Sequence, residues 1–127
     1  MVEAPATPTK IGVFIKDLIF STKLAAATSG LAVDFLRIKD TAAASSVMQQ
    51  KPALVVVNLG ITDSDPFEVV QEAVRSAIPV WCFYSHVEKS QYERARQLGA
   101  EHVYPRSSFF EKIKSEIERI VVRGAGI

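Results

Sequence analysis

The side chains of this chain that could do chemistry gather at short junctions, each directly after an apolar run. The junctions are residues 16–17, 39–40, 58–65, 84–86 and 105–107. They offer a carboxylate at Asp17, an amide at Asn58, a hydroxyl at Ser85 and a guanidinium at Arg106. Carboxylates hold hard cations and accept phosphoryl groups, whereas an arginine beside hydroxyls binds anions. The sequence therefore raises phosphoryl transfer, metal binding and anion binding as chemistries to test.

Apolar runs that alternate with helical segments position these junctions. We expect strands at residues 11–15, 32–38, 53–59, 79–85 and 102–104, and helices at 19–28, from Asp40 or Thr41 to 51, from 66, at 88–98 and from 108. The run at 53–59 is the most apolar and should be the central strand, buried on both faces. Without hairpin signals, this alternation predicts an α/β fold, a doubly wound parallel sheet with helices on both faces. Ligands of such sheets bind beyond the carboxyl ends of the strands, where the junctions lie.

Capping residues mark three of the helix starts. Asp65 precedes Pro66 at the first helical position, and Glu68 is expected to complete a capping box. The segments Ser85–Glu88 and Ser108–Glu111 have the same box pattern. The hydroxyl of Ser85 therefore has two readings, a helix cap or a member of the site.

Length, charge and composition restrict the class of protein. We expect one domain over residues 10–123, between a flexible N-terminal tail at 1–9 and a C-terminal tail at 124–127. A net charge of +1 creates no field that would attract nucleic acid or a membrane surface. The sequence has neither an apolar run of membrane-spanning length nor a signal core, which favours the cytoplasm. The single cysteine, Cys82, excludes an internal disulfide and is expected to be a buried apolar residue; His86 is expected to be solvated and His102 structural.

Several common active-site motifs are absent. The chain has no glycine-rich dinucleotide fingerprint, no P-loop and no nucleophile elbow. We therefore expect no nucleotide cofactor and no enzyme activity.

Four segments give the chain a family resemblance over residues 11–122. IGVFIKD, PALVVVNLG, IPVWCFYS and LGAEHVYPRSSFF resemble the ILVVDD, PDLVLLDLxMP, IPVIMLTA and GADDYLTKPF segments of receiver domains from two-component response regulators. The resemblance implies a flavodoxin-like sheet of five strands in the order 2-1-3-4-5. KDLIFSTK and PRSSFF also resemble a group of bacterial stand-alone receiver-like proteins that lack the phosphorylation residues.

The resemblance places the family's phosphorylation site on residues that depart from its pattern. The acidic pair that holds Mg²⁺ falls on Lys16 and Asp17, and the phosphoacceptor aspartate falls on Asn58. An amide cannot replace a carboxylate as the nucleophile for a phosphoryl group. Asp17 is the only surviving metal candidate, and the ammonium of Lys16 beside it already supplies a cation. We therefore expect neither phosphorylation at Asn58 nor Mg²⁺ binding.

The other two positions of the resemblance also depart from the family. The Thr or Ser that ends the fourth strand falls on Tyr84, or on Ser85 if the frame slips by one, and the lysine falls on Arg106. The fork of Arg106 could hold Asp17 bidentately. We predict that Lys16 or Arg106 neutralises Asp17 in place of a metal. The alternatives are that Asp17 caps the first helix, that Tyr84 is a core aromatic, and that Arg106 with the serines after it binds an anion.

The leading functional hypothesis is a stand-alone pseudo-receiver that acts in signal transduction by binding an unidentified protein. The resemblance implies a partner or homodimer face on the fourth and fifth helices and the fifth strand, with Tyr92, Arg96, Val103 and Tyr104. Two alternatives stay open. One is an active phosphorelay receiver that uses a displaced aspartate, Asp63 or Asp65. The other is a small-molecule binder at the carboxyl end of the sheet, lined by Tyr84, Asn58 and Arg106.

Overall fold

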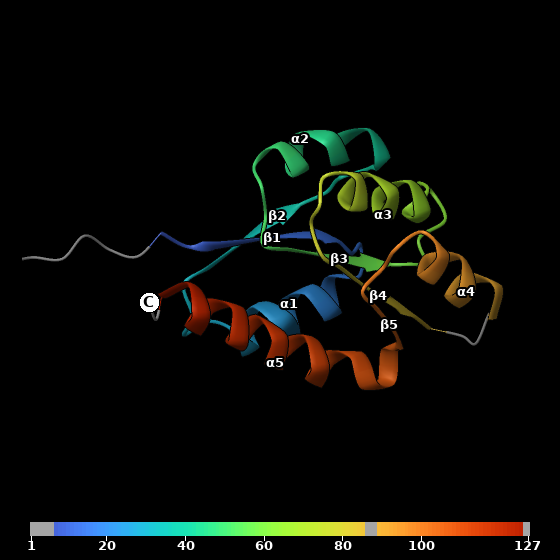
Figure 1. The fold of residues 1–127 in the computed structure, drawn as a ribbon. Helices are drawn as coiled ribbons and strands as arrows, with labels where there is room; N and C mark the ends of the chain where they lie inside the picture. Colours follow the sequence, from blue (N-terminus) through green and yellow to red (C-terminus); the bar gives the residue numbers. More distant parts are fainter. Residues whose placement is uncertain (1–6, 86–88, 126–127) are drawn as a thin grey trace, which may run out of the picture.

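The computed structural model describes residues 7–85 and 89–125. Its strands are β1 Thr9–Phe14, β2 Val33–Arg37, β3 Leu54–Asn58, β4 Val80–Tyr84 and β5 His102–Pro105. They form one parallel sheet in the order β2-β1-β3-β4-β5 (Figure 1). The predicted fold class and strand order are confirmed.

Helices cover both faces of this sheet. They are α1 Leu18–Ala27, the 3₁₀ turn η1 Thr41–Ala43, α2 Ala44–Gln49, α3 Pro66–Arg75, α4 Lys89–Gln97 and α5 Arg106–Ala125. Figure 1 shows α2, α3 and α4 on one side of the sheet and α1 and α5 on the other. None of the helices in the described ranges is both long enough and apolar enough to cross a membrane.

The central strand joins two hydrophobic layers. The side chains of Leu54–Val57 are all fully buried; Val55 and Val57 pack toward α2 and α3, and Leu54 and Val56 pack toward α1 and α5. This confirms that the run at 53–59 is the central strand. Cys82 is fully buried in the first layer, and burial raises the pKa of its thiol above the ordinary range.

Aspartates begin three of the helical segments, as short acidic side chains commonly do. Asp40 accepts a hydrogen bond from the amide of Ala43 (2.9 Å), and Asp65 accepts one from Phe67 (2.9 Å). The expected box with Glu68 is not formed, because the amide of Asp65 donates to the hydroxyl of Thr41 instead (2.9 Å).

Three of the differences from the predicted boundaries concern the two tails and the last helix. Strand β1 begins inside the segment assigned to the tail, because Thr9 donates to the carbonyl of Ala32 (2.8 Å) and pairs with β2. Helix α5 starts at Arg106 and not at a Ser108 cap; β5 runs directly into it, and the Ser108 hydroxyl donates to the carbonyl of Pro105 (3.3 Å). The helix also continues to residue 125, past the boundary at 123. Of the Ser85–Glu88 box, residues 86–88 lie outside the described residues, and His86 with them.

Helices α3 and α4 end in the same hydrogen-bonded motif. After α3, Ala77 donates to Val74 (3.0 Å) and Ile78 donates to Ala73 (2.9 Å); after α4, Gly99 and Ala100 repeat the two bonds (3.0 Å each). This pair of backbone hydrogen bonds at a helix end requires one residue with its backbone in the left-handed region. Ala77 has φ 60° and Gly99 has φ 107°, so an alanine and a glycine occupy equivalent positions.

Candidate functional site

The site builds from the turn that joins β1 to α1. Asp17 is the N-cap of α1, and its Oδ1 accepts hydrogen bonds from the amides of Ile19 (2.9 Å) and Phe20 (3.2 Å). Its other oxygen, Oδ2, accepts a hydrogen bond from the guanidinium of Arg106, at the start of α5. The hydrogen bond from Arg106 is the largest cause that lowers the pKa of Asp17 below its ordinary value, and the hydrogen bond from the backbone amide of Phe20 is the next. Both carboxylate oxygens are therefore engaged within the protein.

Aromatic rings hold the guanidinium of Arg106 in this position. Its central carbon lies 5.2 Å from the ring centroid of Phe20 and 5.8 Å from that of Phe83. The two rings stack on each other, with centroids 4.7 Å apart and planes 15° apart. A guanidinium beside aromatic faces gains cation–π attraction in addition to its ion pair. The Arg106 side chain is 34% exposed, so the ion pair lies at the surface of the domain and not in its core.

Lys16 has a different partner. Its ammonium forms an ion pair with Asp63 in the loop between β3 and α3, at 2.8 Å. Of the two cations proposed to neutralise Asp17, the structure selects Arg106. Asp63 is one of the two aspartates considered for displaced phosphorylation, and Asp65, the other, caps α3.

Asn58 lies at the end of β3, and its side-chain amide forms a hydrogen bond with the loop that follows. The side-chain oxygen accepts a hydrogen bond from the amide of Gly60 at 2.8 Å. This is an Asx turn, in which the side chain replaces a backbone group and starts the turn. The geometry matches the structural reading, in which Asn58 bonds the neighbouring loop.

The residues at the end of β4 do not join the pair of Asp17 and Arg106. Tyr84 is half-buried and packs against the layer of α2, α3 and α4, on the other face of the sheet from Phe83. Ser85 is exposed. The geometry matches the reading of Tyr84 as a core aromatic.

The alternative of an anion site after β5 finds no support in the side-chain contacts. Arg106 turns to Asp17, and the Ser108 hydroxyl donates to the backbone of Pro105. Sequence reasoning did not identify the rings under Arg106 or the Lys16–Asp63 pair. Phe20 follows Asp17 by three positions, which is one turn of a helix, but Phe83 and Asp63 come from other units and leave no local signal.

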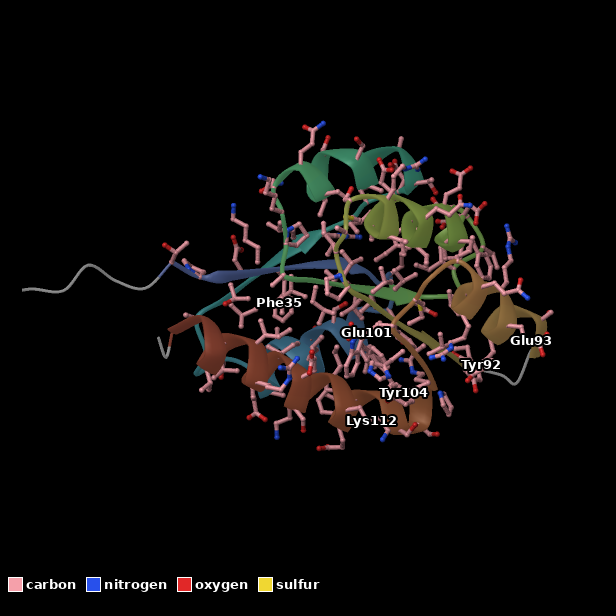
Figure 2. The ribbon with its side chains drawn as sticks, in the orientation of Figure 1. Phe35, Tyr92, Glu93, Glu101, Tyr104 and Lys112 are labelled. Atoms are coloured by element: carbon pink, nitrogen blue, oxygen red, sulfur yellow. The ribbon has the colours of Figure 1, made fainter. Side chains whose placement is uncertain are left out.

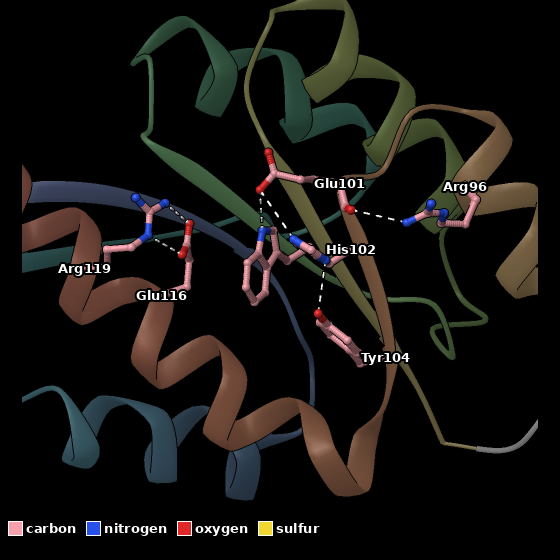
Figure 3. A network of polar contacts seen from close by, with 7 residues as sticks. Arg96, Glu101, His102, Tyr104, Glu116 and Arg119 are labelled. Carbon is pink, nitrogen blue, oxygen red and sulfur yellow. Dashed lines mark hydrogen bonds and ion pairs between the residues drawn. The ribbon is translucent and has the colours of Figure 1, made fainter.

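The predicted partner face contains a connected polar and aromatic cluster. Trp81 donates to the carboxylate of Glu101 (2.9 Å), and the hydroxyl of Tyr104 lies 3.1 Å from Nδ1 of His102 (Figure 3). The Lys112 ammonium lies 5.0 Å from the Tyr104 ring centroid. Figure 2 shows Tyr104 on β5, Lys112 on α5 and Tyr92 on the neighbouring α4, with Glu101 directly before β5. His102 is therefore part of a structural network, as expected.

One residue assigned to this face does not reach the surface. Val103 is 6% exposed and packs into the core, because alternate residues of a strand point to opposite faces. Tyr92 is 39% exposed, Arg96 is exposed and donates to the carbonyl of Glu101 (3.4 Å), and Tyr104 is half-buried. The face retains Tyr92, Arg96 and Tyr104.

Comparison with solved structures places this fold among receiver domains. The chain is similar to the signal receiver domain of the DNA-binding response regulator protein merR of Colwellia psychrerythraea, with a TM-score of 0.73 at 18% identity over 88% of this chain and 97% of that one. It is similar to a CheY-like receiver domain protein of Methanospirillum hungatei, with a TM-score of 0.74 at 8% identity over 94% and 98%. It is also similar to the phosphorylated cyanobacterial phytochrome response regulator RcpA, with a TM-score of 0.72 at 15% identity over 91% of this chain and 92% of that one.

These likenesses establish the fold, and the chain is a receiver-like α/β domain. No protein-family model matches the sequence, and a search of curated proteins finds no relative. The role of the chain must therefore be argued from its own residues.

Proposed function

We propose that this chain is a pseudo-receiver, which acts in signal transduction by binding another protein and is not phosphorylated at Asn58. The observation that carries the proposal is the Asp17–Arg106 pair. It uses the one remaining carboxylate of the degenerate acidic pair as a structural group. An amide at position 58 removes the nucleophile as well.

The residues at these positions do not fit Mg²⁺. A magnesium site needs free, anionic oxygen ligands and several waters. Asp17 offers no free oxygen, and the neighbouring position carries the ammonium of Lys16. Within residues 7–85 and 89–125, no group of three or more histidine, cysteine or acidic side chains could hold a metal ion.

A displaced phosphorylation site has little support. The carboxylate of Asp63 is paired with Lys16, and that of Asp65 caps α3. Phosphorylation of Asp65 would disturb the cap of α3, and Asp63 already pairs with the ammonium of Lys16 in the turn after β1.

Intact-mass spectrometry tests the loss of phosphorylation. The protein is incubated with Mg²⁺ and acetyl phosphate beside a receiver domain that keeps the phosphoacceptor aspartate. We expect the control to gain one phosphoryl group and this chain to keep its mass. A gain of one phosphoryl group by this chain would contradict the proposal, and peptide mapping would then begin at Asp63, Asp65 and Asp17.

Site-specific crosslinking tests protein binding at the α4–β5–α5 face. A photoreactive residue replaces Tyr92 on this face or, as a matched control, the exposed Gln49 at the end of α2. We expect a discrete crosslinked species in cells from position 92 and none from position 49. The same species from both positions, or none from position 92, would contradict binding through this face. A crosslink between two copies of the chain would identify the partner as a homodimer.

A further inference from the structure

An apolar groove of about 260 Å³ opens between α1 and the edge strand β2. Its walls include Val13 of β1, Leu24 and Ala25 of α1, and Phe35 of β2. Leu24 is 2% exposed and forms a buried base, whereas Val13 and Phe35 are half-buried. Figure 2 shows Phe35 on the side of the sheet that faces α1 and α5. The volume lies just below the range for drug-sized ligands, which starts at about 300 Å³, so the groove suits a small molecule.

A single charged residue, Arg37, lines this groove. Its side chain is exposed on the same face of β2 as Phe35, and it has no hydrogen-bond or ion-pair partner among residues 7–85 and 89–125. Helix α1 supplies no acidic residue, and its one charged residue, Lys23, lies over the ring of Phe110 (4.3 Å). The groove therefore combines apolar walls with an unneutralised guanidinium.

Ser21 adds a hydroxyl to the wall of α1. Its side chain is half-buried and makes no hydrogen bond within the described part of the chain. Small-molecule sites typically combine mostly apolar walls with a few polar groups that orient the ligand. Arg37 and Ser21 supply two such groups at one groove.

We propose that this groove binds a small carboxylate that carries an apolar chain or ring. The guanidinium of Arg37 pairs with the carboxylate, because its planar fork matches the two oxygens. The apolar part lies against Val13, Leu24 and Phe35. Arg37 would repel a cation, and the mostly apolar walls offer inorganic phosphate only one further donor, the hydroxyl of Ser21. The site goes beyond the proposed function and does not depend on it.

Binding here would act on the turn that holds the Asp17–Arg106 pair. Ile15 and Leu18 line the groove and flank Asp17 on both sides in the sequence. A ligand in the groove would therefore contact the segment that carries the carboxylate. A protein segment is the competing occupant, and it would also cover Ile19, which is 80% exposed and lies outside the groove.

Titration of the full chain with matched probes, followed by amide NMR spectra, tests the proposal. Hexanoate and phenylbutyrate are the carboxylate probes, and hexanol and hexylammonium are the matched neutral and cationic ones. We expect shifts confined to residues 13–25 and 33–37, and carboxylate affinity roughly tenfold or more above that of the alcohol, as for a charge-assisted hydrogen bond. No tighter binding of the carboxylates than of hexanol, or shifts centred elsewhere, would overturn the proposal.

Four variants separate the groove from general surface effects. Arg37→Gln should remove the preference for carboxylates, whereas Lys39→Gln, which removes a neighbouring exposed cation outside the groove, should not. Ala25→Phe, at an exposed position, should fill the groove and abolish binding of every probe without unfolding the chain. Ile19→Ser should leave binding unchanged.

Two further results would overturn the assignment. The first is carboxylate binding that Arg37→Gln leaves intact. The second is a dimer in light scattering that Ala25→Phe dissociates, because the groove would then be covered by a second copy.

Discussion

The paired ends of α3 and α4 allow a sharp test of the backbone geometry. Ala77 and Gly99 occupy the same place in the same hydrogen-bonded motif, with φ 60° and 107°. Exchanging the residue types, Ala77→Gly and Gly99→Ala, should therefore change stability in opposite directions.

The expected magnitude follows from two opposing effects. A residue with a side chain loses roughly 1–2 kcal/mol in the left-handed region, a loss that glycine avoids. Glycine in turn gives the unfolded chain more freedom, which costs about 0.4–1 kcal/mol of stability. The first effect is larger, so Ala77→Gly should stabilise the fold by about 0.5–1 kcal/mol. Gly99→Ala should destabilise it by at least as much, because the new Cβ would also lie 3.1 Å and 3.3 Å from the methyl carbons of Val74.

Thermal and urea unfolding measure both changes. A change of about 1 kcal/mol should move the midpoint by roughly 2–6 °C in a domain of this size. Gly30→Ala is the matched control, because Gly30 is outside the left-handed region and its Cβ would meet nothing within 4 Å. It should leave stability unchanged or slightly raised. If Ala77→Gly destabilised the protein, or if Gly99→Ala behaved like the control, the strain argument would be wrong.

Three further predictions concern the site and the core. Asn58→Asp alone should not gain a phosphoryl group from acetyl phosphate by intact mass, because Arg106 still occupies Asp17; modification of the single variant would contradict this role of the pair. The pKa of Asp17 is lowered in the fold, so its contribution is complete above its ordinary pKa of 3.8 and is lost as the pH falls through the lower folded value. Urea unfolding of the wild type and of Asp17→Asn should therefore differ at neutral pH and converge in acid, whereas a constant difference would refute the linkage. A thiol reagent should modify Cys82 in urea and not in the native protein, since Cys82 is fully buried; rapid native labelling would contradict that burial.

The fold could be predicted because each strand and helix leaves a local pattern. The run at 53–59 has no polar residue before Asn58, which identifies a strand buried on both faces. Asp65 before Pro66 fixes a helix start within one turn. The predicted helix start at Ser108 was wrong. Helix α5 begins at Arg106, so Ser108 lies inside its first turn, and the capping pattern alone does not distinguish that position from an N-cap.

The part of the site that could be predicted is the ion pair of Asp17, because few cations in the sequence could reach this carboxylate. Asp17 needed a cation, and the sequence offered Lys16 and Arg106. The choice between them depends on Phe20 and Phe83, whose rings hold the guanidinium and come from separate units. The groove at Arg37 left no motif, because its walls come from three elements that meet only in the folded sheet.

The pair at the site also joins distant parts of the chain. Asp17 and Arg106 are separated by 89 residues and belong to the first and last strand–helix units. Strands β3 and β4 lie between β1 and β5 in the sheet, so those units must dock before the two side chains can meet. Closing a loop of this length costs chain entropy before the contact can repay it. We therefore expect the pair to form late in folding, after β3 and β4 have paired between β1 and β5.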